Sequence, residues 1–346
     1  MPSSGSSSKS NSNSNLDGDF ADQEISEDSS LDLLRPVSEE RLNSWLKEFY
    51  GKEVTVKSRE LLRHRDLSYV ERLEIEDGLP ESLIYKLVLP PWDIEQDLHE
   101  RILIPSISNS PQLFMAAHQG QVTAMFMEDL GRGALDKTCG SPEIARRIGE
   151  ELAKMHRSYS YRTDELIQLG ILRSLSPIDY ESFVSSFATK LLNWQLVSEE
   201  QKSSLEKLAK TLASPLAGET ISLVHGDLYA ENIILRGERL FLIDWSWFTA
   251  LGVPLMDIAT LTMAHHKNGG FEQYRSELIE SYCFESGRKD KDVLATLPYA
   301  EALSRVLFLE WLVERKSRGI EGTSVGPVDL LIKTLVNELI ARLHQL

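Results

Sequence analysis

Hydrophobic residues follow two different periods along this chain of 346 residues. In the first part they alternate with polar residues or form short apolar runs, which is typical of β-strands; the segments are EVTVKS, SYVERLEIE, SLIYKLVLP, QLFMAAHQG and VTAMFMEDLG. From Ser141 onward they recur at helical spacing. In SPEIARRIGEELAKMHRSY, for example, Ile148, Leu152 and Met155 form one stripe. The pattern therefore predicts strands first and helices afterwards.

The helical period also marks the other predicted helices. Two of them, SEERLNSWLKEFYG and DIEQDLHERIL, fall within the strand-rich part. The first has Ser38 as its N-cap and Gly51 where the helix should stop. The others follow Ser141, at residues 178–194, 198–213, 254–267, 271–283, 299–317 and 328–345.

Composition divides the chain into three parts. Residues 1–35, which begin MPSSGSSSKSNSNSN, contain too few apolar side chains to offset the entropy of ordering them, so we expect a disordered acidic arm. Residues 36–130 should form a strand-rich N-terminal lobe, and residues 131–346 a mostly helical C-terminal lobe, with a short connection near 128–134. The predicted fold class is α+β.

Charge and composition exclude several classes of protein. The formal net charge of −16 argues against a nucleic-acid partner; it suits a cationic small molecule, but it equally serves solubility. The chain has neither a run of eighteen apolar residues nor a cationic start followed by an apolar core, so we expect neither a membrane span nor a secretory signal. Its two cysteines, Cys139 and Cys283, lack metal-ligand spacing, which favours a reduced, cytoplasmic protein.

Four polar side chains interrupt the largely apolar stretch LVHGDLYAENIILRGERLFLIDW at residues 223–245. They are His225, Asp227, Asn232 and Asp244, and they fall at strand ends and in one loop, where side chains can converge on a cleft. Two carboxylates and an amide offer the oxygen ligands that Mg²⁺ needs, and kinase-type phosphoryl transfer uses this set. The alternative is a capped β-hairpin whose polar groups only satisfy the backbone.

The stretch resembles the catalytic loop of the aminoglycoside phosphotransferase and choline kinase group, which are small-molecule kinases related to the protein kinases. That group reads H-G-D-x-x-x-x-N, as residues 225–232 do, and IDWSWFTALGVPLMDIA resembles its metal-binding segment through Gly252, Pro254 and Asp257. The resemblance implies a two-lobed, protein-kinase-like fold. It also implies Mg²⁺-dependent transfer of the γ-phosphoryl group of ATP or GTP to a hydroxyl of a small molecule.

The resemblance assigns roles to individual residues. Asp227 would be the catalytic aspartate, and Asn232 and Asp244 the metal ligands. Lys86, in LIYKLVL, resembles the lysine that grips the nucleotide phosphates, although it could be an ordinary lysine of an edge strand. Its expected ion-pair partner is Glu100, with Asp97 and Glu95 as competitors. His225 should brace the loop, whereas His156 should pack within its helix.

The sequence indicates the other contacts to the nucleotide less clearly. MEDL resembles the connection whose backbone reads the nucleobase, which implies a role for Glu128 and Leu130. The segment LLRHRDLSYVERL contains no glycine, so a glycine-rich loop is missing and Ser68 is the candidate hydroxyl for the phosphates. Ser246 stands where relatives often carry an acidic residue or glycine. Together these departures leave the choice between ATP and GTP open.

The sequence leaves two alternative functions and the identity of the acceptor to consider. A catalytically silent, nucleotide-binding relative could act as a recognition module, but the presence of the lysine, both aspartates and the asparagine argues against it. A protein kinase is disfavoured because the Ala-Pro-Glu signature is missing. Aminoglycosides, amino alcohols, sugars and natural-product hydroxyls are all open as acceptors. The candidate residues for a cationic acceptor, which ordinary surface carboxylates would explain equally well, are Asp164, Asp179, Glu181 and Glu310.

Overall fold

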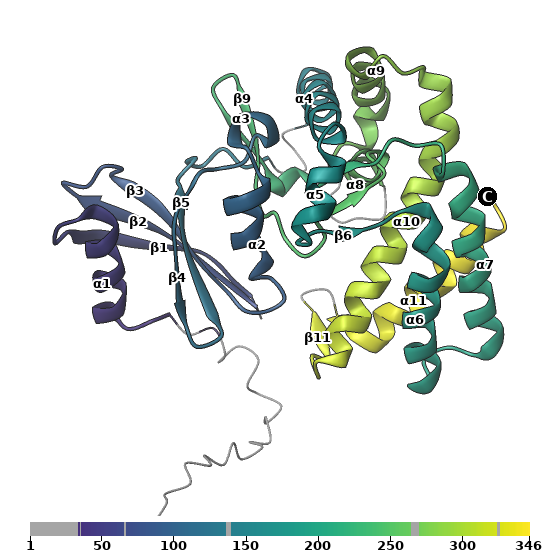
Figure 1. The fold of residues 1–346 in the computed structure, drawn as a ribbon, viewed down its shortest axis with the longest axis horizontal. Coiled ribbons are helices and arrows are strands. Elements are labelled where there is room, and N and C mark those ends of the chain that lie inside the picture. The colour runs from purple at the N-terminus through teal and green to yellow at the C-terminus, as the bar shows by residue number, and fades with distance from the viewer. Residues whose placement is uncertain (1–33, 35, 66, 136–139, 264–269, 324–325) are drawn as a thin grey trace, which may run out of the picture.

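The computed structural model describes residues 34, 36–65, 67–135, 140–263, 270–323 and 326–346. The expected disordered arm lies outside these residues, except for Leu34, as do Cys139 and the end of the helix predicted at 254–267. Within them the two-lobed fold is confirmed. A sheet with α1 forms the N-terminal lobe at the left of Figure 1, and packed helices form the C-terminal lobe at the right.

The N-terminal lobe is a five-stranded antiparallel sheet in the order β1-β2-β3-β5-β4. The strands are β1 (Thr55–Arg65), β2 (Ser68–Glu76), β3 (Ser82–Val88), β4 (Leu113–Gln119) and β5 (Val122–Glu128). All five predicted strands are therefore confirmed, although β1 runs well beyond EVTVKS. Because β3 lies between β2 and β5, side chains on its buried face point into the lobe rather than toward solvent.

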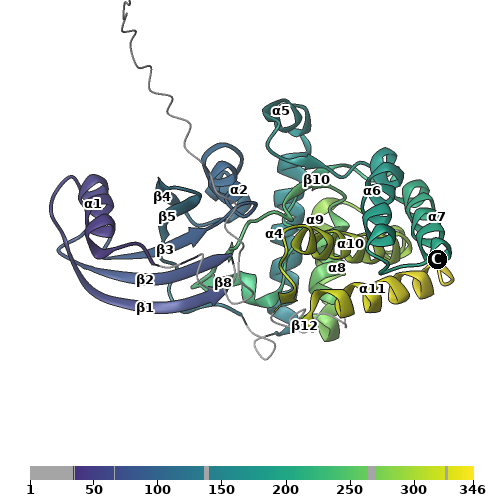
Figure 2. The ribbon, with the colours of Figure 1, turned by 90° about the horizontal axis from the view of Figure 1, so that it is seen from below.

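Helix α1 (Glu39–Tyr50) covers one face of this sheet, as Figure 2 shows. Its predicted ends are confirmed: the side chain of Ser38 accepts a hydrogen bond from the Arg41 backbone, and Gly51 adopts a left-handed conformation with φ 68°. Trp45 packs edge-on against Phe126 of β5, with ring centroids 6.3 Å apart. The helix thereby closes the core of the lobe.

A short helix stands between the sheet and the helical lobe in both views (Figures 1 and 2). The predicted helix DIEQDLHERIL is present as α2 (Ile94–Asp97), which continues as a π-helical turn, η1 (Leu98–Ile102). Helix α3 (Pro105–Ser108) follows before β4. A π-helical turn is rare and changes which way the following side chains point, so helical spacing alone could not predict their directions.

The C-terminal lobe is built from helices. They are α4 (Pro142–Ser160), α5 (Thr163–Leu169), α6 (Tyr180–Asn193), α7 (Glu199–Leu216), α8 (Leu255–Thr262), α9 (Arg275–Ser286), α10 (Asp290–Ser317) and α11 (Val328–Leu343), with 3₁₀ turns η2 (Pro177–Asp179), η3 (Ala230–Asn232) and η4 (Glu272–Tyr274). The predicted helices in the described residues are confirmed, and α5 is an addition. Helix α10 begins well before the predicted residue 299, because it passes through Pro298 rather than starting after it.

Short strands position the loops that form the candidate site. They are β6 (Arg173–Ser174), β7 (Ser222–Val224), β10 (Ala250–Gly252), the hairpin β8 (Ile233–Arg236) with β9 (Arg239–Leu242), and the pair β11 (Gly322–Thr323) with β12 (Gly326–Pro327). The connection between the lobes is tied to this hairpin, since the Leu135 backbone donates to Ile233 and the Leu235 backbone donates to Gly133. The expected boundary near residue 130 stays a prediction.

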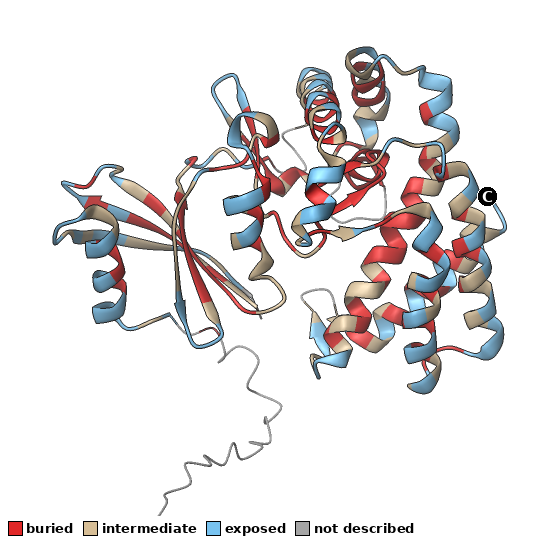
Figure 3. Cartoon of the chain, in the orientation of Figure 1, coloured by how far each residue is buried: buried red, intermediate tan, exposed pale blue. Residues whose placement is uncertain are grey.

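The largest core lies in the helical lobe. Figure 3 shows many buried residues along the helices of this lobe, and α8 and α10 are rich in them. Helices α4 and α9 approach so closely that a Cβ on Gly149 would lie 2.4 Å from the backbone oxygen of Leu278. Among the described residues, no helix combines the length and the apolar character that crossing a membrane requires.

Candidate active site

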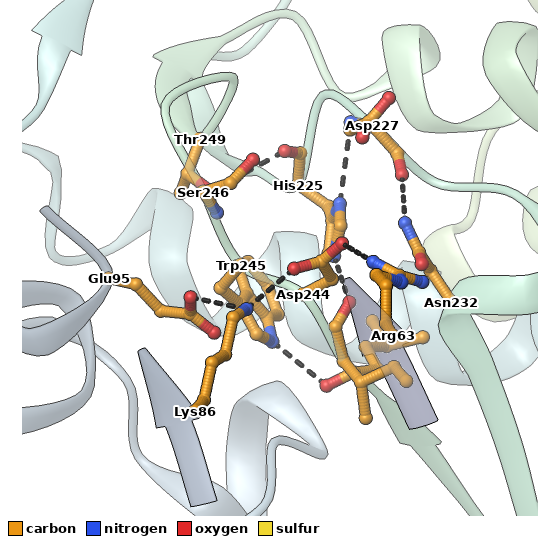
Figure 4. Close-up of polar contacts among 12 residues, drawn as sticks. Arg63, Lys86, Glu95, His225, Asp227, Asn232, Asp244, Trp245, Ser246 and Thr249 are labelled. Atoms are coloured by element: carbon orange, nitrogen blue, oxygen red, sulfur yellow. Dashed lines mark hydrogen bonds and ion pairs between the residues drawn. The ribbon is translucent and has the colours of Figure 1, made fainter. Parts of the chain in front are cut away.

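Lys86 points from β3 into the space between the lobes (Figure 4). Its ammonium nitrogen lies 2.6 Å from Oδ1 of Asp244 and 2.5 Å from Oε2 of Glu95. The side chains of Lys86 and Glu95 are 7% and 1% exposed. A buried lysine with two carboxylates is not an ordinary lysine of an edge strand, so that alternative is wrong. Burial alone would lower the pKa of Lys86, but the two carboxylates raise it, and the lysine remains charged.

The expected partner of Lys86, Glu100, is corrected by the structure: Glu95 takes this position. Glu100 is exposed and accepts a hydrogen bond from Nε2 of Gln96, 2.9 Å away. Asp97 is also exposed and faces Arg101. The reason is the rotation of α2 about its axis, which tertiary packing sets: burying Leu98 turns Glu95 toward the lysine and Glu100 toward solvent.

Asp244 follows β9 and has both carboxylate oxygens engaged. Besides the contact of Oδ1 with Lys86, its Oδ2 accepts a hydrogen bond from Nη1 of Arg63, 2.8 Å away on β1. Burial alone would raise the pKa of Asp244, but the charges of Lys86 and Arg63 hold it well below its usual range. Its φ of 64° is uncommon for a residue other than glycine, and such backbone strain clusters at functional sites.

Asp257 of α8 holds the first residues of the predicted catalytic loop, residues 225–232. Its carboxylate accepts hydrogen bonds from the backbone nitrogens of His225 and Gly226, at 3.0 and 2.8 Å, and lies 3.1 Å from Nε2 of His156. His156 is buried in α4 as expected, and it makes this contact with Asp257 in addition. Burial would raise the pKa of Asp257, but these hydrogen bonds and the nearby histidines lower it, which keeps the carboxylate charged.

His225 braces the loop, as expected. Its Nε2 donates to the backbone oxygen of Ile243 at 2.9 Å, and its Nδ1 accepts from the backbone nitrogen of Asp227 at 3.3 Å. One donating and one accepting nitrogen define a neutral ring. Burial lowers the pKa of His225, in agreement with that form. The ring thus joins the loop to the strand end that precedes Asp244.

Asp227 and Asn232 lie on the far side of Asp244 from Glu95 in Figure 4. The side-chain nitrogen of Asn232 donates to the backbone oxygen of Asp227 at 2.8 Å, so its amide oxygen is the atom left for a cation. Burial raises the pKa of Tyr229 well above its usual value, with a further contribution from the charge of Asp227 and a hydrogen bond to it. The phenol therefore stays protonated beside the candidate catalytic carboxylate.

A cavity of about 320 Å³ opens between the lobes beside these residues. Its apolar lining comes from both sides, with Val70, Ile84 and Met127 from the sheet and Ile234 and Ile243 from the hairpin region. Its polar end carries Arg63, Lys86, Glu95, Glu231 and Asp244. An apolar slot whose polar end holds the cations Arg63 and Lys86 suits a ligand with an aromatic ring at one end and anionic groups at the other.

A family model described as the phosphotransferase enzyme family, APH, matches residues 107–295, more than half of the chain. This chain belongs to that family. The resemblance of its catalytic loop to aminoglycoside phosphotransferases is thereby confirmed, and the chain is an enzyme of the phosphotransferase class.

Individual proteins also resemble this chain. The curated Protein LicA of Haemophilus influenzae is 37% identical over 67 residues, which cover 19% of this chain and only 24% of that protein. A spectinomycin phosphotransferase, APH(9)-Ia, solved with ADP and spectinomycin, superimposes with a TM-score of 0.56 at 15% identity, covering 90% of this chain and 100% of that one. The GDP complex of aminoglycoside 2'-phosphotransferase-IIIa superimposes with a TM-score of 0.60 at 14% identity, covering 89% and 98%. At these identities the two structures show the fold.

The remaining nucleotide candidates of this phosphotransferase occupy different places. Glu128 and Leu130 both line the cavity. Ser68 begins β2 in register with Val88 and is not among the residues that line the cavity. Instead, Arg63 on the facing strand reaches Asp244. Sequence reasoning missed Arg63, and its only signal was a hairpin that carries arginines where a glycine-rich loop was expected.

A second network missed from the sequence stiffens the connection between the lobes of the phosphotransferase. Arg72 of β2 donates from Nε to Asp129, from Nη1 to Glu60 and from Nη2 to the backbone oxygen of Gly131, at 2.8, 2.7 and 3.1 Å. These contacts connect three segments that border the cavity. The backbone of the connection is therefore held in place before any ligand binds.

The candidate acceptor residues of the phosphotransferase are scattered. Glu310 of α10 pairs with Arg173, whose guanidinium also lies 4.2 Å from the ring centroid of Trp247. Glu181 faces Lys210 on an exposed surface, and Asp164 and Asp179 are exposed. The structure does not gather these four carboxylates into one site.

Proposed function

We propose that this phosphotransferase transfers the γ-phosphoryl group of ATP or GTP to a hydroxyl group of a small molecule, with Mg²⁺ as cofactor. One observation carries the proposal. Lys86, held by Glu95, meets Asp244 at the polar end of an interlobe cavity, next to the loop that carries Asp227 and Asn232. This is the set of groups that phosphoryl transfer requires.

The nucleotide would enter with its base between the apolar walls of the cavity. Lys86 would then hold phosphate oxygens, because its ammonium is buried, charged and fixed by Glu95. The backbone of the connection, near Glu128 and Leu130, would contact the edge of the base. A rigid site of this kind aligns the reacting groups in advance, which removes much of the entropic cost of the reaction.

In the proposed reaction the acceptor oxygen attacks the γ-phosphorus. The bond between that phosphorus and the oxygen bridging to the β-phosphate breaks, and the nucleoside diphosphate leaves with the bond's electron pair. The acceptor's proton passes to the carboxylate of Asp227, which also orients the hydroxyl. Tyr229 beside it keeps its own proton, so the phenol does not compete for this role.

The donor atoms fit Mg²⁺. Asp244 offers a carboxylate and Asn232 an amide oxygen, whereas the described residues contain no group of three His, Cys, Asp or Glu side chains that could hold a metal alone. Few protein ligands, completed by phosphate and water, are typical of Mg²⁺. When bound, the ion neutralises phosphate charge.

The proposed acceptor is a small molecule that carries a hydroxyl group. A cationic acceptor draws support from the net charge of −16. Glu310, however, is already neutralised by Arg173, which also covers a face of Trp247. We propose that the enzyme acts in the cytoplasm, without a nucleic-acid or membrane partner, on the basis of its acidity and of Cys283, a buried thiol whose pKa burial raises to about 12.

The test uses the purified chain with Mg²⁺ and ATP, or GTP, and a panel of aminoglycosides, amino alcohols, macrolides and sugars. Release of nucleoside diphosphate and a gain of one phosphate group on an acceptor, detected by mass spectrometry, are expected for at least one class. Asp227→Asn should lower turnover by a factor of about 10² to 10⁴ with nucleotide affinity nearly unchanged. Asp292→Asn, an exposed carboxylate near the start of α10 that is not a candidate site residue, is the control.

Two outcomes would contradict the proposal in different ways. Nucleotide binding without transfer to any acceptor would favour the silent, partner-recognition alternative. Equal turnover in Asp227→Asn and the parent protein would remove Asp227 from the chemistry.

A further inference from the structure

Among the described residues that line the polar end of the cavity, Arg63 is the cation for which the proposed mechanism has no role. It comes from β1, near the turn that leads into β2, and its Nη1 lies 2.8 Å from Oδ2 of Asp244. Asp244 is the only ion-pair partner that the described part of the chain gives it. Figure 4 shows its guanidinium beside the proposed metal-binding carboxylate, opposite Lys86.

This contact conflicts with the proposed use of Asp244. A Mg²⁺ ion binds a carboxylate oxygen at about 2.0–2.1 Å, so an ion on Oδ2 would lie against the guanidinium that already occupies it. Two cations at that distance repel strongly in a partly buried site. Arg63 must therefore leave Asp244 when the metal–nucleotide complex binds.

The charges around Arg63 determine where its guanidinium can move. Glu95, Glu231 and Asp244 line this end of the cavity together with Arg63 and Lys86, so carboxylates outnumber cations there before any ligand enters. A triphosphate adds more negative charge at the same place. A guanidinium is also the side chain best suited to hold two phosphate oxygens at once.

The hairpin that carries Arg63 lacks the usual means of binding phosphates through its backbone. From Arg59 to Leu73 it contains no glycine, and β1 and β2 are paired as far as Arg65 and Ser68, apart from a register shift between Leu61 and Arg63. Paired backbone groups are not available to a ligand. A side chain that points into the cavity is the contact that this hairpin can offer.

We propose that Arg63 binds the terminal phosphates of the nucleotide, exchanging Asp244 for phosphate when the metal–nucleotide complex enters, and so replaces a glycine-rich loop. The inference rests on the proposed function and adds a residue to it. Two properties follow. Arg63 discriminates a triphosphate from a nucleoside, and it opposes the binding of metal in the absence of nucleotide.

Nucleotide titration tests the first property. Arg63→Met keeps the length of the side chain without its charge, and Arg63→Lys keeps the charge without the planar fork. Arg59→Met is the matched control, because Arg59 lies on the same strand but pairs with Glu71 and does not line the cavity. With Mg²⁺ present, calorimetry would measure the affinity of each protein for adenosine, ADP and the non-hydrolysable β,γ-imido analogue of ATP, with the guanosine series in parallel.

We expect Arg63→Met to bind the triphosphate analogue at least tenfold more weakly than the parent, with a smaller loss for the diphosphate and none for the nucleoside. Arg63→Lys should fall between them. Arg59→Met should keep the parent's ratio of triphosphate to nucleoside affinity. Titration of Mn²⁺ alone, followed by electron paramagnetic resonance, should show tighter binding to Arg63→Met than to the parent, because the competitor for Asp244 is gone.

Three results would overturn the inference while leaving the proposed function standing. Tighter binding of the triphosphate by Arg63→Met would mean that Arg63 blocks the nucleotide site instead of binding phosphate. An equal loss for all three ligands would make its role structural, and an unchanged preference for the triphosphate would make it irrelevant to phosphates. A parent protein that binds neither nucleotide series would instead remove the proposed function itself.

Discussion

At the scale of single residues, the candidate site depends on how its charged side chains are paired. Lys86 is shared between Glu95 and Asp244, and of these two carboxylates only Asp244 is proposed to bind the metal. In the proposed function, Glu95 continues to hold the lysine when Asp244 binds the metal. A buried charge that loses its partner is costly, whereas an exposed one is not.

Glu95 is buried and Glu100 is exposed on the same short helical segment, so we expect their replacement to have different effects. Glu95→Gln should lower the free energy of unfolding by about 1–3 kcal/mol and lower kcat/KM, because Lys86 is left with Asp244 alone and competes with the metal for it. Glu100→Gln should change stability by less than about 0.5 kcal/mol and leave kcat/KM unaltered. Denaturant unfolding and steady-state kinetics would measure both.

A double-mutant cycle provides the control for that prediction. The effects of Lys86→Met and Glu95→Gln on kcat/KM should be non-additive, since either change breaks the same contact. Additive losses, or a Glu100→Gln variant that is impaired as much as Glu95→Gln, would show that the lysine is held differently in solution.

At the scale of elements, close packing of backbones decides how the catalytic loop is supported. Helix α4 supplies His156, which contacts Asp257 beneath the loop, and α4 itself packs along α9. Gly149 lies in that packing, and a Cβ there would also lie 3.0 Å from the backbone nitrogen of Tyr282. Backbone atoms cannot move aside as a flexible side chain can.

We therefore expect Gly149→Ala to destabilise the protein, although alanine is the better helix former. The clash with the backbone of Leu278 should cost about 1–3 kcal/mol, which exceeds the gain of up to about 1 kcal/mol in helix propensity. Gly218→Ala is the matched control, because nothing lies within 4 Å of its added Cβ and its backbone does not require glycine. Thermal unfolding of the two variants would measure the difference; a Gly149→Ala protein as stable as Gly218→Ala would contradict the packing described.

At the scale of the whole molecule, the question is where the folded structure starts. Leu34 is completely buried in the core of the N-terminal lobe, in the same cluster as Trp45 and Tyr85. The Ser/Asn-rich residues before it have no comparable apolar content. The stabilising contribution of this end of the chain should therefore come from Leu34 and the residues that follow.

Removal of residues 1–30 should accordingly change the free energy of unfolding by less than about 0.5 kcal/mol and leave turnover unaltered. Leu34→Ala in the full chain should cost about 2–5 kcal/mol, because it empties a buried site. Both are measured by denaturant unfolding of otherwise identical proteins. If the truncation cost as much as Leu34→Ala, the arm would have to pack on the folded lobes.

The sequence by itself determined what depends on neighbours along the chain. Strand and helix periods, caps such as Ser38 and the spacing of Asp227, Asn232 and Asp244 are local, so they predicted the two lobes and the family. Local patterns failed where geometry departs from the common period. The π-helical turn after α2 and the passage of α10 through Pro298 are the examples.

Only the tertiary structure decided which distant side chains share the site. Lys86 and Asp244 are 158 positions apart, and Arg63 and Asp244 are 181 apart, so no local spacing relates them. The choice of Glu95 over Glu100 depended on which face of a short helix was buried. Packing fixes such rotations and approaches through the sum of many contacts, and no single segment contains that information.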